Sequence, residues 1–476
     1  MALIIVESPT KARTFNRILK GQDFFVFATM GHIRDLPGEK MAVNFENNFE
    51  PEYAIIKNKE KTVAKLKELA KENNEVILAT DADREGESIS YHAAYLLGLI
   101  EENWPEIKFK NDLVVKRIVF HEITPNALKE AMEHPSELRI DLVKAQQARR
   151  ILDRIVGYQL SPLLWKKMNK NWLSAGRVQS VALRIIVERE KEINKFTLED
   201  YFQINGEFKN TAASDHPIST LKAKLLSKDD TLYEQKFKLD LFAGEYTYTK
   251  TTISEENKDA IQADIKSDTF SVSNVTEDIA NRYPPPPYTT SLLQMDMFQK
   301  MGLSSKMTMR IAQDLYERGL ITYHRTDSFN LSTQFVFRAK DYIEATYGKE
   351  YALEKPRGFR TKSKNAQEAH EAIRPTRLDK AVETIETDKK ITANHKKVYK
   401  YIFDRAIATQ MKEAQVKNIK VDILGNKKYL FQAEMQKVLF DGFLKVLNPD
   451  YVEKNQFESP FNQGDTVSLE TLEEQA

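Results

Sequence analysis

The sequence of 476 residues contains no cysteine. This absence excludes disulfide bonds, thiolate zinc sites and cysteine nucleophiles, so a covalent catalyst here must use another side chain. Long apolar runs are also missing, since nowhere do about 18 apolar residues follow one another as a membrane-spanning helix requires. The opening run, Ala2–Val6, is too short for a signal-peptide core and has no basic leader. We therefore expect a cytoplasmic protein with no membrane partner.

Neither sign of charge dominates the sequence. The 71 Lys and Arg residues are balanced by 70 Asp and Glu residues, which leaves a net charge of +1. A site for a polyanion must therefore be a local patch. The hydrophobic share of 41% and the charged share of 30% are ordinary for a folded protein. The length is enough for about three domains.

Strands and helices alternate in the first part of the sequence. Apolar runs at residues 2–6 and 76–80 predict buried strands, and residues 115–120 predict a third strand; each is followed by a loop and a helix. This order favours a mostly parallel α/β sheet over about the first 135 residues. In such sheets the functional loops follow the carboxyl ends of the strands.

The later sequence predicts helices and β structure in turn. Residues 141–193 have a helical period, with an apolar stripe through Ala148, Ile151, Leu152, Ile155 and Val156. Short alternating segments at 200–275 and 416–469 predict two β regions that can pair in one domain. Four consecutive prolines, 284–287, mark a domain boundary, after which helices are predicted at 290–300 and 304–318.

Two acidic loops follow predicted strands. Asp81, Asp83 and Glu85 alternate after the second strand, and Glu7 ends the first. Oxygen ligands of this kind suit a hard cation such as Mg²⁺, although a solvated acidic turn is an equally good interpretation of the pattern alone. Lys11 and Arg84 lie in the same loops. They favour a site for both metal and phosphate over isolated structural salt bridges.

A third group of reactive side chains lies at residues 319–328, where Gly319 ends a predicted helix. Tyr323 and Arg325 stand two residues apart, among an imidazole and several hydroxyls. A tyrosine in an extended segment is usually a packed aromatic residue. The neighbouring guanidinium favours a second interpretation, because a phenolate that attacks a phosphodiester needs a fixed cation at the developing charge.

Nine motifs in order give the sequence a resemblance to a known family. They are IVESPTKA, ATMGHIRDLP, TDADREGE, FHEIT, QQARRILDRIVGYQLSPLLW, SAGRVQS, PPPYTTSLLQ, GLITYHRTDS and NAQEAHEAIRP. The sequence resembles the type IA DNA topoisomerases, and within them the bacterial topoisomerase I group. The resemblance implies a multidomain fold of α/β, α and β parts that form a toroidal clamp. The implied parts are a Toprim (Rossmann-like) domain at 1–138, a helical single-strand-binding domain at 139–213, a β-rich arch in two pieces at 214–283 and 411–476, and a helical domain with the catalytic tyrosine at 284–410.

The resemblance also implies an activity. Members of the family are isomerases that cut one DNA strand through a 5′-phosphotyrosyl link, pass a strand and religate, and so relax negative supercoils without ATP. The absence of a Gly-x-x-x-x-Gly-Lys-Ser/Thr loop agrees with this. By motif, Tyr323 corresponds to the nucleophile. Arg325, Lys11 and Glu7 take further catalytic roles, and Glu7, Asp81, Asp83 and Glu85 correspond to the Mg²⁺ site.

The implied partners are single-stranded DNA and negatively supercoiled duplex DNA, and we expect a monomer. Arg149 and Arg150 can hold phosphates from one helix face, with Asp153 either orienting them or reading a base edge. Tyr158 and Trp165 can stack on bases, or pack in a core with equal weight. The other DNA contacts implied by the resemblance are His32, Ser174, Ala175, Gly176, Arg177, Val178, Gln179, Arg325 and His370.

Other functions fit parts of the sequence. A Toprim-type nuclease or primase would share the carboxylates but has no need of Tyr323 with Arg325. A noncatalytic single-strand-binding fragment would need neither group. Relatives in the family continue past the Gly464-Asp465-Thr466 stretch into further helices, whereas this sequence ends at Ala476. We therefore expect the chain as written to bind single strands weakly and to relax supercoiled plasmid poorly.

Overall fold

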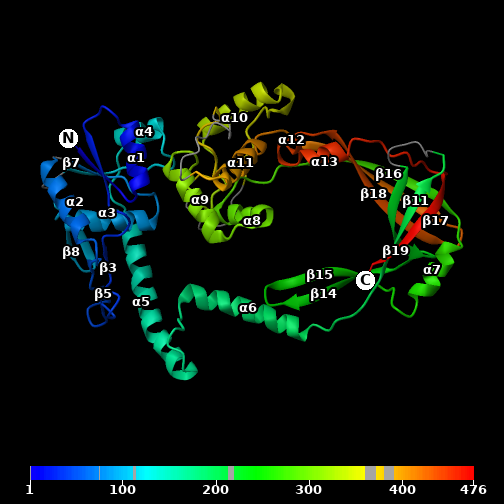
Figure 1. Cartoon of the computed structure of the whole chain (residues 1–476), viewed down its shortest axis with the longest axis horizontal. Helices are drawn as coiled ribbons and strands as arrows, with labels where there is room; N and C mark the ends of the chain where they lie inside the picture. The colour runs from blue at the N-terminus through cyan, green and yellow to red at the C-terminus, as the bar shows by residue number, and fades with distance from the viewer. Residues whose placement is uncertain are drawn as a thin grey trace. The chain divides into compact units, whose positions relative to one another are not determined.

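The computed structural model describes residues 2–73, 75–110, 114–212, 219–359, 371–379 and 391–475. The chain divides into two compact units, each built from segments that are far apart in sequence (Figure 1). Unit 1 takes residues 1–181, 286–342 and 354–410. Unit 2 takes residues 182–285, 343–353 and 411–476.

A four-stranded parallel sheet lies at the centre of the N-terminal part of unit 1, in the order β10-β7-β1-β2. Leu3 and Ile5 of β1 share a core with residues of the two helices α2 and α3. Every residue of β1 is buried, as is typical of a parallel strand covered on both faces. The predicted α/β architecture is thereby confirmed. The elements are β1 (Ala2–Val6), α1 (Pro9–Ile18), β2 (Phe24–Ala28), α2 (Glu60–Glu72), β7 (Glu75–Leu78), α3 (Arg84–Leu96), β10 (Val114–Arg117) and α4 (Pro125–Glu133).

Three short strand pairs accompany this sheet, β3 with β6, β4 with β5 and β8 with β9. They are β3 (Arg34–Asp35), β4 (Val43–Asn44), β5 (Glu50–Pro51), β6 (Ala54–Ile55), β8 (Ile100–Asn103) and β9 (Glu106–Phe109). The first two pairs lie in the segment between β2 and α2. One small core there joins Leu36 and Val43 to Ile151 of a later helix, α5.

The rest of unit 1 is mainly helical. The helix α9 packs against α1, α8 and α11, so it joins the later helices to the parallel sheet. The hydroxyl of Thr14 on α1 donates a 2.7 Å hydrogen bond to the carbonyl of Glu317 at the end of α9. The helices are α5 (Ile140–Met168), the first turns of α6 (Arg177–Lys195), α8 (Thr290–Met301), α9 (Ser305–Glu317), most of α10 (Thr333–Thr346) and α11 (Ala393–Ala408).

The buried face of α5 differs from the predicted apolar stripe. Ala148 is exposed and Leu152 is 50% exposed, so of the predicted stripe only Ile151 is buried. The buried positions include polar side chains that have partners. Gln146 accepts from Ser88, and Arg154 donates to the carbonyls of Leu36 and Pro37. Because hydrogen bonds offset the cost of burying these groups, the apolar period alone pointed to the wrong face.

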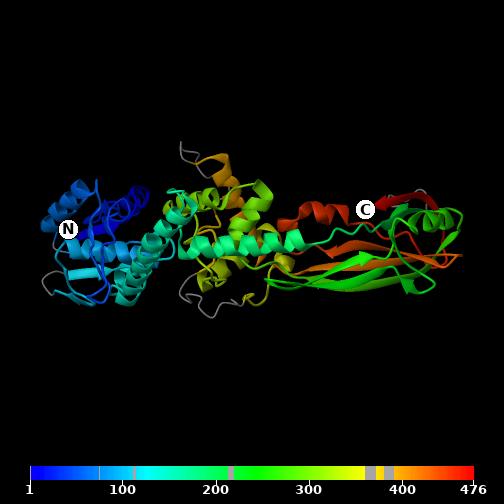
Figure 2. The same ribbon diagram turned by 90° about the horizontal axis from the view of Figure 1, so that it is seen from below.

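Unit 2 is built around an antiparallel sheet that is seven-stranded within the part of the chain described, in the order β11-β19-β16-β17-β18-β12-β13. Since β11 also pairs with β12, the strands from β11 round to β12 close on one another. Figure 2 shows the long strands lying side by side. The strands are β11 (Gln203–Asn210), β12 (Thr220–Lys228), β13 (Thr231–Leu232), β16 (Phe270–Arg282), β17 (Ala414–Gly425), β18 (Tyr429–Phe440) and β19 (Thr466–Gln475).

This sheet joins the two β-rich parts of the sequence, because β16 from the first part pairs with β17 from the second. The strand β11 belongs to this sheet as well. The domain bounds predicted from the sequence place residues 203–210 at the end of the helical segment 139–213 instead. The remaining elements of unit 2 are the hairpin β14 (Glu234–Leu241) with β15 (Gly244–Thr251), α7 (Lys258–Lys266), the short 3₁₀ helix η1 (Lys349–Tyr351), α12 (Leu444–Leu447) and α13 (Pro449–Lys454).

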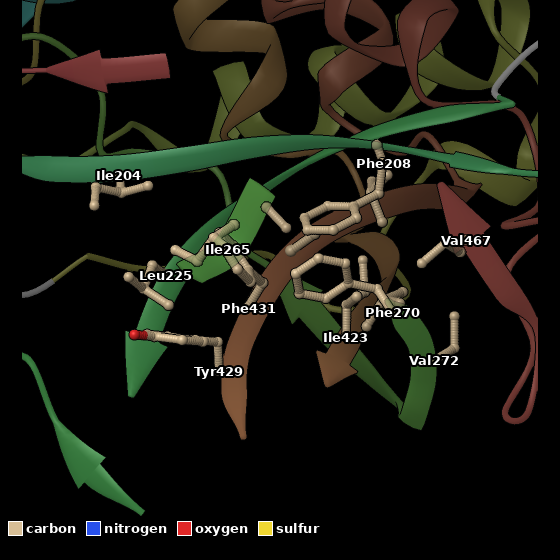
Figure 3. Packing of buried hydrophobic residues seen from close by; sticks show 14 of the residues in the cluster. Ile204, Phe208, Leu225, Ile265, Phe270, Val272, Ile423, Tyr429, Phe431 and Val467 are labelled. Atoms are coloured by element: carbon tan, nitrogen blue, oxygen red, sulfur yellow. The ribbon is translucent and has the colours of Figure 1, made fainter. Parts of the chain in front are cut away.

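Aromatic rings fill the core of this sheet (Figure 3). Phe208, Phe270 and Phe431 are buried and meet edge to face, with ring centroids 5.0 to 5.8 Å apart. Such pairs add to the stabilisation from buried apolar area. Elsewhere, no helix among the described residues combines the length and apolarity needed to cross a membrane.

Candidate active site

A lysine and two carboxylates meet where β1 and β7 end. These strands are parallel neighbours, so the residues that follow them emerge at the same edge of the sheet. Lys11 Nζ lies 2.5 Å from Glu7 Oε1 and 2.6 Å from Asp81 Oδ1. The lysine side chain is fully buried, whereas each carboxylate keeps 12% exposure. One cation thus holds two acids at the opening of the site.

The two carboxylates differ in protonation. Burial and the charge of Asp81 raise the pKa of Glu7 to about 8. Burial also acts to raise the pKa of Asp81, but the charge of Lys11 and the hydrogen bond that it donates outweigh burial and lower that pKa to about 2. Glu7 therefore keeps its proton at neutral pH while Asp81 is ionised.

The loop after β7 is held in a tight turn by α3. Asp83 caps this helix, and its side chain accepts a 2.8 Å hydrogen bond from the amide of Gly86. A Cβ atom at Gly86 would lie 2.2 Å from the carbonyl oxygen of Asp81. Only glycine permits this approach, which keeps the acidic residues of the loop close together.

Arg117, at the end of β10, holds the same loop through its side chain, and no role in the site was predicted for it from the sequence. Its buried guanidinium donates to the carbonyls of Leu78, Thr80 and Asp81, at 2.8 to 3.2 Å. It also forms a buried ion pair with Glu87 at 3.0 Å. An arginine inside the predicted strand 115–120 was the available signal, because a charge in a buried strand needs partners.

Tyr323 faces this loop from the end of α9. Gly319 ends the helix with a φ of +73°, and a Cβ atom there would lie 2.3 Å from the carbonyl oxygen of Ile123. The amide of Tyr323 then donates to the carbonyl of His121 at 2.8 Å.

The phenol of Tyr323 is 3% exposed and donates a 2.6 Å hydrogen bond to Asp83 Oδ2. Arg325 Nη1 lies 3.4 Å from the same oxygen.

The surroundings keep this phenol neutral. Burial and the negative charges of Asp81 and Asp83 raise the pKa of Tyr323 far above its ordinary value, and Arg325 only partly opposes them. The adjacent His324 is buried as well, and burial together with Arg325 lowers its pKa to about 4. Tyr323 can therefore attack only if a base takes its proton while a cation meets the developing charge.

Glu85 lies apart from the other acids, in a second group. Its carboxylate meets His32 Nε2 at 3.1 Å and accepts from Gln146 at 3.3 Å, and the hydrogen bond from His32 lowers its pKa. These residues line a cavity of about 320 Å³. The other lining residues are Arg34, Asp35, Tyr53, Ser88, His92, Arg149, Arg150 and Asp153. Three of the predicted DNA-binding residues on α5 thus share a cavity with His32.

Each charged residue in that cavity already has a protein partner. Arg150 makes two hydrogen bonds to Asp35, at 2.9 and 2.7 Å. Asp153 accepts from Arg177 at 2.5 Å and lies 4.0 Å from Arg149. Side chains that are paired and still partly exposed are preorganised to exchange one partner for a phosphate.

The predicted metal ligands have suitable chemistry but do not form a complete cluster. Among the described residues, no three acidic or histidine side chains lie close enough together to hold a metal ion. Lys11 bridges Glu7 and Asp81, while Asp83 accepts a hydrogen bond from Tyr323. Glu7 Oε2 is buried and makes no hydrogen bond, so this oxygen can serve as a ligand once the carboxyl group has lost its proton. Oxygen donors of this type suit Mg²⁺.

The remaining predicted DNA contacts lie around the turn between α5 and α6. Tyr158 contacts Arg154, whose guanidinium lies 4.6 Å from the ring centre, and donates to the carbonyl of Gly38. Trp165 donates to the carbonyl of Leu173 at 2.6 Å. In the segment 174–179, Gln179 donates to Ser174 at 3.0 Å and Val178 is 63% exposed. The predicted contact His370 lies outside the described residues.

Comparisons with known proteins match the parts of the chain that carry these residues. A family model described as DNA topoisomerase matches residues 137–476, and a model of the Toprim domain matches residues 2–123. The DNA topoisomerase match includes Tyr323 and Arg325, and the Toprim match includes the acidic loops.

Individual relatives agree with the family models. DNA topoisomerase 1 of Campylobacter jejuni is 40% identical over 99% of the chain and 63% of the relative, and that of Xylella fastidiosa is 41% identical over 95% and 53%. The structure of full-length topoisomerase I from Thermotoga maritima, 37% identical, superposes with a TM-score of 0.77 over 99% of this chain and 72% of that one. The chain thus spans between about half and two thirds of the length of these curated relatives.

Proposed function

The chain belongs to the type IA family of DNA topoisomerases, and from this premise we propose that it cleaves one DNA strand through Tyr323, passes a strand and religates it without ATP. The observation that carries the proposal is the pairing of Tyr323 with Asp83 at 2.6 Å, beside Arg325. It gives a nucleophile, a proton acceptor and a cation in one place.

In the proposed cleavage step, the oxygen of Tyr323 attacks the phosphorus of a phosphodiester. Its proton passes to Asp83, which already accepts the hydrogen bond. A new bond to the 5′ phosphate forms as the bond to the 3′ oxygen breaks. Arg325, 54% exposed and so accessible to a strand, stabilises the charge on the phosphoryl oxygens.

The leaving 3′ oxygen needs a proton. Glu7 and Lys11 share a hydrogen bond at the mouth of the site, and both hold protons at neutral pH. Either group can protonate the 3′ oxygen in cleavage and take the proton back in religation, because the same group serves both directions of a reversible step.

Toprim domains bind metal ions. We propose Mg²⁺ as the ion, with Asp81, Asp83, Glu7 and Glu85 as the residues that would hold it. The support is the oxygen-only donor set and the unpartnered oxygen of Glu7. When bound, the ion would supply positive charge that offsets the phosphate and the acidic loop.

For substrate binding, we propose that a single strand passes through the cavity of His32, Arg149, Arg150 and Asp153, with the segment 174–179 and His370 as further contacts. Negatively supercoiled duplex DNA is then the substrate for relaxation. The five-part domain division, the toroidal clamp, a monomeric state and a cytoplasmic location are proposed with it, on the resemblance of the motifs.

A nuclease or primase with a Toprim domain is the second candidate, since it would use the same acidic loops. It is disfavoured because the DNA topoisomerase family match covers the part of the chain that carries Tyr323. The two candidates differ in their products. A nuclease releases both DNA ends, whereas the proposed enzyme keeps one end attached to the protein.

The experiment is a denaturing gel of the chain mixed with labelled single-stranded DNA. We expect a covalent adduct with the wild type and none with Tyr323→Phe, which removes only the phenolic oxygen. Tyr246→Phe, at a 55% exposed tyrosine of β15, is the matched control and should form the adduct as the wild type does. An adduct with Tyr323→Phe would refute the proposal.

A further inference from the structure

Two of the nine motifs, FHEIT and NAQEAHEAIRP, meet on either side of the segment that carries Tyr323. On one side the amide of Tyr323 donates to the carbonyl of His121, in the motif FHEIT, at 2.8 Å. On the other side the amide of Thr322 donates to the carbonyl of Arg374, near the end of the second motif, at 2.9 Å. The backbone of the proposed nucleophile is therefore held between two segments that are far apart in sequence.

The side chain of Arg374 connects these two segments. Its Nη1 lies 2.9 Å from Oε2 of Glu122, the residue that follows His121. Its Nε donates to Glu371 at 2.6 Å, and its Nη2 donates to the hydroxyl of Ser332 at 3.1 Å. Arg374 is only 5% exposed, so water screens these contacts weakly. Because the guanidinium is planar and is held at three nitrogens, it fixes the spacing between Glu122 and the backbone of Arg374.

Thr322 transmits this spacing to the proposed nucleophile. Its hydroxyl donates to the carbonyl of Ala372 at 2.7 Å and accepts from the amide of Arg374 at 2.9 Å. The threonine is fully buried, so water does not compete for these hydrogen bonds. A shift of Arg374 relative to Glu122 therefore moves the residue next to Tyr323. Such a shift matters for the attack on phosphorus, because a displacement of about 1 Å can cost about 100-fold in rate.

Arg374 differs from Arg325 in what it can touch. The side chain of Arg325 is 54% exposed beside Asp83 and can receive a phosphate. The guanidinium of Arg374 is buried among its protein partners, and the ring of Phe335 lies 4.9 Å from its central carbon. Arg374 is thereby shielded from a DNA strand, and its effect on the reaction must pass through the residues that it holds.

We propose that Arg374, paired with Glu122, is a positioning residue for Tyr323. The pair sets the distance between the two segments that hold the tyrosine, and so keeps the phenol within hydrogen-bonding distance of Asp83. The proposal rests on the proposed function and adds to it two residues that act through the backbone of the nucleophile. It predicts a slower attack on phosphorus, with unchanged affinity for DNA and unchanged departure of the leaving group.

The first test is Arg374→Lys, which keeps the positive charge but loses the planar fork that holds three partners. At saturating single-stranded DNA we expect adduct formation to slow about 100-fold, while the affinity for the strand stays the same. Arg405→Lys is the matched control, because Arg405 is also largely buried in unit 1 and lies 3.5 Å from Asp296. It should form the adduct at the wild-type rate. An unchanged rate in Arg374→Lys, or a loss explained by weaker binding of the strand, would overturn the proposal.

A double-mutant cycle tests the pairing of the two residues. Glu122→Gln keeps the shape and one acceptor oxygen of the side chain, so it should slow adduct formation less than Arg374→Lys does. Added to Arg374→Lys, it should cause little further loss, because the two residues act as one pair. Losses that multiply in the double variant would overturn the assignment of Glu122. Urea midpoints of every variant show whether each one is folded, and Glu122→Gln keeps the test open if Arg374→Lys is not.

A substrate with sulfur in place of the 3′ oxygen at the cleaved bond separates positioning from proton transfer. In this substrate the bond from phosphorus to sulfur breaks, and a thiolate leaves without needing a proton from Glu7 or Lys11. Glu7→Gln should therefore be slow with the oxygen substrate and recover with the sulfur substrate. Arg374→Lys should be slowed by the same factor with both, since the attacking oxygen is displaced in each. Recovery of Arg374→Lys on the sulfur substrate would place its effect at the leaving group and overturn the proposal.

Hydrogen exchange gives a reading that needs no catalysis. The amides of Thr322 and Tyr323 are hydrogen-bonded to the two segments, so Arg374→Lys should speed exchange in a peptide of residues 319–325, and Arg405→Lys should not. Faster exchange in Arg374→Lys without any adduct from the wild type would support the positioning and refute the cleavage reaction. An adduct from the wild type, with neither the exchange nor the rate changed in Arg374→Lys, would do the reverse.

Discussion

Tyr323 and Asp83 are 240 residues apart in sequence, and their side chains share a 2.6 Å hydrogen bond. Asp83 also caps α3 through the amide of Gly86. One carboxylate thus fixes the start of a helix with one oxygen and receives the phenol with the other. The position of the proposed nucleophile is therefore coupled to the fold of the acidic loop.

Asp83→Asn should separate these two roles. Asparagine is as good a helix cap as aspartate, so the stability of the chain should hardly change. It cannot take the proton of Tyr323, and we expect the rate of adduct formation to fall about 100-fold or more. The rate is measured in a single turnover with labelled single-stranded DNA. A rate equal to that of the wild type would show that another group accepts the proton.

Gly319→Ala should damage both stability and the placement of Tyr323. The new methyl group would meet the carbonyl oxygen of Ile123 in a backbone conformation that already costs about 1 kcal/mol for alanine. Gly302→Ala is the matched control, since Gly302 has a φ of +65° and open space around it. We expect the urea midpoint to fall more for Gly319→Ala than for Gly302→Ala. Equal midpoints would mean that the approach to Ile123 is of no consequence.

Arg117→Met should be strongly destabilising, by about 3 to 5 kcal/mol, because it leaves Glu87 buried without its partner. The neighbouring pair Lys116 and Glu75 lies at the surface, so Lys116→Met should cost less than about 1 kcal/mol. Both changes are read from urea unfolding curves. The account of the buried pair fails if the two variants lose similar stability.

His92 should make the stability depend on pH. Its ring is buried against Tyr53 and Tyr91, and burial lowers its pKa well below the ordinary value. Above about pH 6.5 both folded and unfolded forms hold the neutral ring, so there is no effect. Below that pH the His92 ring binds a proton in the unfolded form but stays neutral in the folded form. The free energy of unfolding therefore falls by up to about 1.4 kcal/mol per pH unit. Comparing His92→Gln with the wild type between pH 7 and pH 5 isolates this contribution, and parallel curves would count against it.

Much of the fold could be predicted from the apolar pattern. The apolar runs at 2–6 and 76–80 lie over β1 and β7, because central parallel strands are apolar throughout. The segment 115–120 lies over β10, an edge strand that also carries Lys116 and Arg117. The strand β2 was missed, although its sequence FFVFA is apolar throughout; it lies at the edge of the sheet, where Phe25 is 40% exposed. Polar residues on the buried face of α5 were also missed, because their partners are distant in sequence.

Some contacts of the candidate site could likewise be predicted from the sequence, and others could not. Parallel neighbouring strands bring Glu7, Lys11 and Asp81 together, and a sequence pattern can indicate that. The contact between Tyr323 and Asp83 depends on how α9 packs on α1, which no local pattern records. Glu85 was expected with the other acids, but it lies with His32 and Gln146, since it belongs to the first turn of α3 and no longer to the loop.

The most direct test of the central claim is to identify the amino acid that carries the DNA. Trypsin cuts after Arg318 and Arg325, so the peptide Gly319–Arg325 contains a single tyrosine. We predict that mass spectrometry of the digested adduct will find this peptide with a nucleotide attached to Tyr323 through a 5′ phosphate, and that the released DNA will end in a 3′ hydroxyl. A nucleotide on any other peptide, or attachment through a 3′ phosphate, would contradict the account.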